Sequence, residues 1–284
     1  MNSEPAWLCE PESLLAFVPG TPLNEISPDK TVGFEGSRAE GIALTEHEAE
    51  VLERTQEQLF AGGRHGGGSS VLLILQGMDT AGKGNVIRHV VSHMHPGGVR
   101  HSSFTAPTPE ELAHDFLWRV RKRLPQRGEV GVFDRSHYED VLIGRVRPRV
   151  SFDEIESRYD TINAFEAEVV ARGTSLVKVM LHVSKDEQKR RLASRLERVD
   201  KQWKFDPSDI DDRLLWDRYQ HAYQIALDRT SVPSAPWYVV PADNKWFARL
   251  AVQHLLIRAL ERLDISWPPP NYDINEQKAR LAAS

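Results

Sequence analysis

A short apolar run that breaks into a glycine-framed loop constrains the fold of this chain more than any other feature. The run is Val71-Leu72-Leu73-Ile74-Leu75, and Gly77-Met78-Asp79-Thr80-Ala81-Gly82-Lys83-Gly84 follows it after one residue. A buried strand, such a loop and the start of a helix together direct backbone N–H groups and a lysine ammonium at an anion. The pattern therefore predicts a phosphate site made by Gly77, Ala81, Gly82, Lys83 and Gly84. An ordinary glycine-rich turn between a strand and a helix is the alternative.

The loop has the spacing G-x-x-x-x-G-K, but it lacks the hydroxyl that normally follows the lysine. Gly84 stands where a serine or threonine would bind Mg²⁺. Asp79, which lies inside the loop, is the candidate for the missing metal ligand because Mg²⁺ prefers carboxylate oxygens.

Strand-like and helix-like segments alternate after this loop, which predicts an α/β fold. The expected strands span 71–76, 99–104, 129–133, 176–183 and 237–240, and the expected helices span 44–60, 84–93, 108–124, 152–172, 210–227 and 246–263, with a further charged helix from Ser184. Strands joined by crossover helices form a mostly parallel sheet covered on both faces. Ligands bind at the carboxyl ends of such strands.

Composition restricts the organisation and the partners of the chain. The 284 residues, 40% hydrophobic, suffice for one α/β domain at 44–284, preceded by an arm at 1–43 that is rich in Pro, Gly and acidic residues. A single cysteine, Cys9, excludes a disulfide framework and is compatible with the cytoplasm, and we find neither a signal peptide nor an apolar run that could span a membrane. The net charge of −5 argues against nonspecific nucleic-acid binding, so a local basic patch must bind any polyanion.

A second motif follows the expected third strand. It is Asp134-Arg135-Ser136-His137-Tyr138-Glu139-Asp140, which begins at the point where the strand ends. Nucleotide-processing α/β folds place a metal-organising carboxylate at such a position. The alternative is that Asp134 caps a helix and Arg135 forms a salt bridge. We favour the functional interpretation because this strand end is expected to lie beside the glycine-rich loop.

A third motif is the basic segment expected to form a lid at about 184–208. Residues 185–204 contain eight Lys and Arg residues and four acidic ones, and several of the basic residues share one helical face. A solvated charged helix is the alternative. Because the segment follows a strand end, we expect a lid that clamps phosphates through Lys185, Arg191, Arg195 and Lys204.

These motifs together resemble the polyphosphate kinase 2 family. The matching segments are 75–83, 133–142, 103–107, 111–119, 203–205 and 237–246, and the resemblance runs from about residue 12 to residue 268. The resemblance implies a P-loop kinase fold related in shape to thymidylate kinase. It also implies reversible, Mg²⁺-dependent phosphoryl transfer between inorganic polyphosphate and adenine or guanine nucleotides, and a homo-oligomer, either a dimer or a tetramer.

The family divides by acceptor, and the second motif bears on this division. His137-Tyr138-Glu139-Asp140 is similar to the third class, which uses both nucleoside monophosphates and diphosphates, whereas Asp134 stands where that class often has Asn. The resemblance implies catalytic roles for Asp79, Lys83, Asp134, Arg135 and Glu139, with Asp79 and Asp134 at the metal. The rival functions are an ATP-dependent nucleoside or nucleotide kinase on the same fold and a catalytically silent phosphate sensor.

Overall fold

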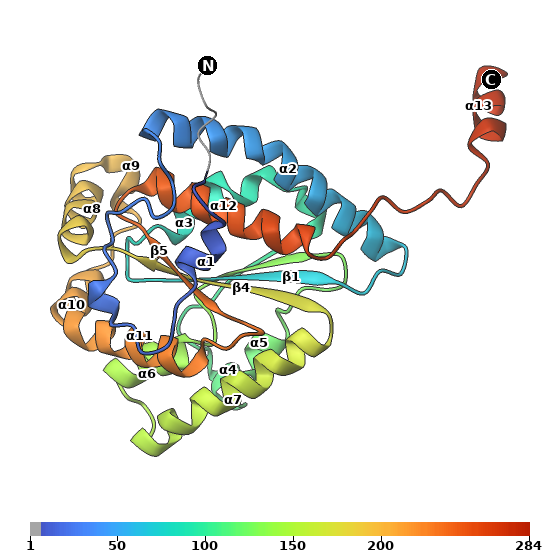
Figure 1. Cartoon of the computed structure of the whole chain (residues 1–284). Helices are drawn as coiled ribbons and strands as arrows, with labels where there is room; N and C mark the ends of the chain where they lie inside the picture. Colours follow the sequence, from blue (N-terminus) through green and yellow to red (C-terminus); the bar gives the residue numbers. More distant parts are fainter. Residues whose placement is uncertain (1–6) are drawn as a thin grey trace.

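The computed structural model describes residues 7–284, which are built around one five-stranded sheet (Figure 1). The strands are β1 (Ser70–Gln76), β2 (Val99–Ser103), β3 (Val130–Asp134), β4 (Thr174–His182) and β5 (Trp237–Pro241). Their order in the sheet is β2-β3-β1-β4-β5, and every pair is parallel. All seven residues of β1 are buried, as expected for a central parallel strand covered on both faces. The predicted parallel α/β sheet is confirmed.

Helices cover both faces of this sheet (Figure 1). One layer contains α2 (Arg38–Arg64), α3 (Lys83–His89) and α12 (Lys245–Glu261), and the other contains α6 (Glu139–Val146), α7 (Phe152–Ala171) and α11 (Trp216–Thr230). The other helices are α1 (Pro11–Leu15), α4 (Pro109–Leu112), α5 (Trp118–Arg121), α8 (Lys185–Glu197), α9 (Val199–Gln202), α10 (Ser208–Leu214) and α13 (Ile274–Ala282), with 3₁₀ turns at Leu23–Glu25, Val91–His93 and Pro96–Gly98. In the part of the chain that the structure describes, no helix is long and apolar enough to cross a membrane.

Several helix boundaries differ from the expected ones for local reasons. The helix expected at 108–124 is broken into α4 and α5, because the Asp115 side chain accepts a hydrogen bond from Leu117 N and its carbonyl accepts one from Trp118 N. Such local acceptors compete with the helical pattern. The first long helix begins at Arg38 rather than at residue 44, because Ser37 and Glu40 form a capping box.

The segment before α2 lies along the outer edge of the sheet. Ala16 forms an antiparallel bridge with Tyr238, and Phe17 N donates to Trp237 O at 2.7 Å. Residues 16–17, which we call the N-terminal strap, therefore cover the edge of β5. This edge would otherwise present unpaired backbone groups. At the other end of the chain, α13 extends away from the body and has no buried residue (Figure 1).

Candidate active site

The glycine-rich loop begins at the carboxyl end of β1 and enters α3 at Lys83. Gly77 has φ +148°, and a Cβ there would lie 2.7 Å from the Leu181 carbonyl oxygen, so only glycine fits. Gly82 has φ +129° and is the residue immediately before α3. The loop thus wraps around the N-terminus of α3, which is the geometry that backbone amides need in order to surround an anion.

Lys83 is buried at the centre of this loop. Its Nζ donates to Gly77 O at 2.6 Å, which holds the ammonium against the loop. Burial, together with the positive charge of Arg135, lowers the pKa of Lys83, while the carboxylates of Asp79 and Asp134 oppose this shift. The charged groups of the first and second motifs therefore act on the same lysine.

The second motif lies beside the loop because β3 pairs directly with β1. Asp134 is in register with Leu75, and Arg135 N donates to Leu75 O at 3.0 Å. Arg135 has φ +64°, a left-handed conformation that is strained in a non-glycine residue. Its guanidinium donates to Asp79 Oδ1 at 2.7 Å. The expectation that these two strand ends lie side by side is confirmed.

Glu139 is the first residue of α6 and lies behind the loop. It is half-buried, and Gln76 Nε2 donates to its Oε1 at 3.2 Å. Burial raises the pKa of Glu139, while the charges of Arg135 and Lys83 oppose the shift. Glu139 is not among the described residues that line the cavity of the site.

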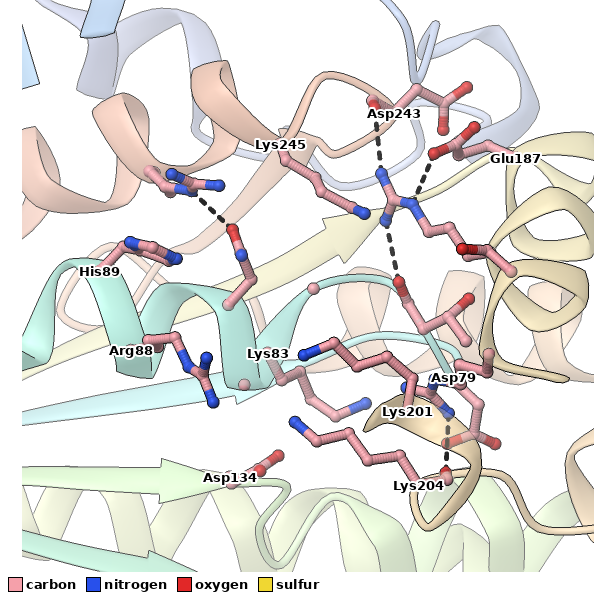
Figure 2. A pocket seen from close by; sticks show the side chains of 18 of the residues that line it. Asp79, Lys83, Arg88, His89, Asp134, Glu187, Lys201, Lys204, Asp243 and Lys245 are labelled. Carbon is pink, nitrogen blue, oxygen red and sulfur yellow. Dashed lines mark hydrogen bonds and ion pairs between the residues drawn. The ribbon is translucent and has the colours of Figure 1, made fainter. Parts of the chain in front are cut away.

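A cavity of about 1100 Å³ opens above the loop at the carboxyl ends of the strands. Among the described residues that line it are twelve Lys and Arg residues and six Asp and Glu residues. Figure 2 shows side chains from α3, the lid and α12 that point into this space above Lys83 and Asp134. The excess of positive charge is local, since the whole chain has a net charge of −5. Such a surface favours a polyanionic ligand.

The structure separates the four lid residues predicted to clamp phosphate. Arg195 and Lys204 line the cavity, whereas Lys185 is exposed and does not line it. Arg191 lines the cavity too, but its five guanidinium hydrogen bonds go to the carboxylate of Glu187 and to the carbonyls of Thr80, Ala81, Ala242 and Asp243. All five donors are therefore used, and these contacts indicate a brace between α8 and the loop instead of the predicted clamp.

Sequence reasoning missed several basic residues of the cavity. They are Arg38 on α2, Arg88 on α3, and Lys245 and Arg249 on α12. The signal that could have identified them is their place in the fold: Lys245 follows shortly after the end of β5, and Arg249 lies one helical turn further on the same face. Arg88 likewise lies one helical turn after Gly84, on the same face of α3.

Positive charges crowd one another in this cavity. Burial and the charges of Arg88, Lys201 and Arg195 together lower the pKa of Lys204. A bound polyanion would relieve that repulsion. The two carboxylates predicted at the metal, Asp79 and Asp134, also line the cavity. In residues 7–284 no three His, Cys, Asp or Glu side chains are grouped as a metal site.

Comparisons with known proteins agree with this arrangement. The family model described as polyphosphate kinase 2 matches residues 38–267. An AMP/ADP-polyphosphate phosphotransferase from Meiothermus ruber is 44% identical over 248 residues, which cover 87% of this chain and 91% of the relative. An ADP-polyphosphate phosphotransferase from Rhodopseudomonas palustris is 42% identical over 253 residues, covering 85% and 86%. The crystal structure of polyphosphate kinase 2 from Arthrobacter aurescens TC1 superimposes with a TM-score of 0.96 at 47% identity, covering 98% of this chain and 99% of that one.

Proposed function

This chain belongs to the polyphosphate kinase 2 family and has its P-loop kinase fold, and we propose that it transfers phosphoryl groups between inorganic polyphosphate and adenine nucleotides. The observation that carries the proposal is the strongly basic cavity of about 1100 Å³ directly above the loop that ends in Lys83. A polymer of phosphates needs many cationic contacts, whereas a single terminal phosphate needs only the loop.

In the proposed reaction, the loop holds the phosphoryl group that is transferred. Lys83 and the amides of 82–84 bind its equatorial oxygens, and Arg135 contacts the nucleotide phosphate. An oxygen of the nucleotide's terminal phosphate attacks, a new P–O–P bond forms, and the bond to the next phosphate of the polymer breaks. No general base is required because the attacking oxygen is already an anion near neutral pH. Phosphoryl transfer of this kind depends on in-line placement and charge neutralisation.

The residues of the site suit Mg²⁺. Mg²⁺ is bound through one or two carboxylates, substrate phosphates and retained waters, so Asp79 and Asp134 suffice as protein ligands. Bound there, the ion would neutralise charge on the phosphates. The Arg135–Asp79 contact at 2.7 Å holds the Asp79 carboxylate in a fixed orientation at the rim of the loop.

We assign the polymer to the basic residues above the loop. Arg195, Lys201 and Lys204 come from the lid side, and Arg88, Lys245 and Arg249 come from α3 and α12. Arginine can bind two oxygens at once, whereas lysine is a point charge that tolerates movement of the polymer. Polyphosphate presents many equivalent anions, so such a surface gives avidity without a fixed register.

The proposed polymer site is tested by replacing two lysines and by varying the salt concentration. We expect the Lys201→Ala/Lys204→Ala double variant to raise the KM for polyphosphate about tenfold and to weaken its increase with ionic strength. Lys185→Ala is the matched control, because Lys185 is a lid lysine that does not line the cavity. Equal effects in the double variant and the control, or a wild-type KM insensitive to salt, would place the polymer elsewhere.

The function itself is tested by turnover with long-chain polyphosphate and Mg²⁺, with AMP and ADP offered separately and the products separated by chromatography. Product from either acceptor supports the proposal. Turnover only when ATP is the donor would indicate an ordinary nucleotide kinase. Binding of polyphosphate without any turnover would indicate a sensor.

We propose further that the chain uses both acceptors, as the third class of the family does, and that Glu139 contributes to this choice. The support is its position beside Arg135 and Lys83 at the edge of the loop. A carboxylate there would help hold a second metal ion when the acceptor is a monophosphate. Glu139→Asn is expected to lower kcat/KM about tenfold more for AMP than for ADP. Measuring both acceptors on one preparation makes the ratio its own control, and equal losses would contradict the assignment.

A cytoplasmic location and a homo-oligomeric state remain proposals as well. The support for the first is the single cysteine, Cys9, which is exposed and free. The support for the second is α13, where Ile274 and Leu281 are exposed on a helix that extends from the body. Light scattering of the purified chain would distinguish a monomer from a dimer or tetramer.

A further inference from the structure

A buried ion pair lies beneath the second motif and outside the cavity. Lys178 on β4 and Glu166 on α7 are fully buried, and Lys178 Nζ lies 2.7 Å from Glu166 Oε2. The same ammonium donates to Thr230 O at 2.7 Å and to the Tyr138 hydroxyl at 3.1 Å. All three of its donors are therefore used within the protein interior.

The other oxygen of this carboxylate reaches the second motif. Glu166 Oε1 accepts a hydrogen bond from the Tyr138 hydroxyl at 2.8 Å and lies 3.2 Å from His137 Nε2. Both of these side chains have no exposed surface. His137 and Tyr138 are the two residues immediately before Glu139. The Glu166 carboxylate therefore anchors the segment that leads into Glu139.

Stability alone does not account for this cluster, which we define as Lys178, Glu166, Tyr138 and His137. Removing two charges from water is costly, and well-packed apolar residues of similar volume usually stabilise a protein as well or better. Burial by itself would raise the pKa of Glu166, but the ammonium of Lys178 and the contact with His137 lower it, so the carboxylate stays ionised. A charged cluster in which Lys178 uses all three donors and both oxygens of Glu166 accept hydrogen bonds specifies one geometry where an apolar core would tolerate several.

The contacts of the cluster converge on the surroundings of Glu139. Tyr138 is the residue that precedes α6, and its side chain is anchored to α7 and β4 through Glu166 and Lys178. Lys178 also bonds the carbonyl of Thr230, the last residue of α11, and α11 packs against α6. Through Thr230 and Tyr138, the cluster thus connects α11 with the start of α6, where Glu139 lies.

We propose that this buried cluster positions Glu139, and through it the acceptor nucleotide. The proposal rests on the proposed phosphoryl transfer, because the acceptor is what Glu139 is assigned to select. The members of the cluster are positioning residues, since all four side chains are buried in the interior whereas Glu139 is only half-buried.

The first test removes one oxygen atom. Tyr138→Phe keeps the ring and its packing but deletes the hydroxyl that links Lys178 and Glu166 to the second motif. We expect kcat/KM for AMP to fall about tenfold, because small displacements of a positioned group reduce turnover strongly, while the KM for polyphosphate stays unchanged. Tyr159→Phe is the matched control: Tyr159 is a fully buried tyrosine on α7 with one hydrogen bond, from Arg145 at 3.3 Å.

The second test replaces the ion pair with a neutral one. Lys178→Met/Glu166→Gln is expected to remain folded, with a melting temperature near that of the wild type, and to show the same selective loss with AMP. Unchanged kinetics in Tyr138→Phe, or a loss no greater than that of Tyr159→Phe, would overturn the proposal. If the neutral pair does not fold, Tyr138→Phe still decides the question.

A double-mutant cycle shows whether the cluster acts through Glu139. In a Glu139→Gln background, Tyr138→Phe is expected to cause little further loss with AMP, because coupled residues are not additive. Additive losses would show that the cluster acts on folding or on another part of the site. A wild-type enzyme that does not use polyphosphate with either acceptor would instead refute the proposed function, so the two failures are distinguishable.

Discussion

Replacing Lys83 with alanine is expected to lower turnover by about two to three orders of magnitude, or about 3–4 kcal/mol of transition-state stabilisation. Lys83 is the buried cation at the centre of the loop, where its Nζ is held 2.6 Å from Gly77 O. A cation fixed in a partly dehydrated site stabilises charge on the transferred phosphoryl group far more strongly than one in water. The adjacent cation, Arg135, is already paired with Asp79.

Steady-state kinetics at saturating polyphosphate and nucleotide would measure this loss. Lys185→Ala is the control, since it removes a lysine that does not line the cavity. A second measurement uses pH: because burial lowers the pKa of Lys83 from 10.5, kcat/KM is expected to decline with rising pH before an ordinary lysine would lose its proton. Near-normal turnover of Lys83→Ala would remove this residue from the mechanism.

Asp79→Asn is the second large expected effect, again about two to three orders of magnitude in turnover. Asparagine keeps the shape of the side chain and can still accept the hydrogen bond from Arg135, so the loop should retain its conformation. What the variant removes is the negative charge proposed to hold Mg²⁺ beside the phosphates. The loss should therefore appear in the chemistry and not in folding.

Two measurements separate these roles for Asp79. The Mg²⁺ concentration for half-maximal rate should rise in Asp79→Asn, and the melting temperature should stay within a few degrees of the wild type. Asp200→Asn is the control, because Asp200 is an exposed lid carboxylate that pairs with Arg198 and does not line the cavity. An unchanged Mg²⁺ requirement would assign Asp79 to orienting Arg135 instead.

The centre of the site could be predicted from the sequence because it depends on local order along the chain. Gly77 and Asp134 each follow an apolar strand, and the carboxyl ends of parallel strands meet at one edge of the sheet. The nearness of Arg135 to the loop that contains Asp79 follows from the pairing of β3 with β1. The position of the charged helix α8 could be predicted for the same reason, since Ser184 follows β4.

The other parts of the site could not be predicted, because they depend on packing between segments that are distant in the sequence. Arg88 and Arg249 have ordinary helical neighbours, and only the meeting of α3 with α12 brings them into one cavity. Arg191 shares a charged helix with Arg195, yet its face turns toward the loop carbonyls, and the pattern of charges does not reveal which face is buried. Lys178 interrupts an apolar strand, which is a signal of an internal partner, but its partner Glu166 is identified only once α7 lies against β4.

The N-terminal strap has a consequence for the order in which the molecule is assembled. Phe17 is synthesised well before its hydrogen-bond partner Ser231, which lies 214 residues further along the chain. The strap therefore waits, without its final contacts, until β5 has been synthesised and has joined the sheet. Until the strap has paired with β5, the outer edge of that strand is open to pairing with other chains. Closure of the strap is thus expected to be a late step of folding, and one at which productive folding competes with aggregation.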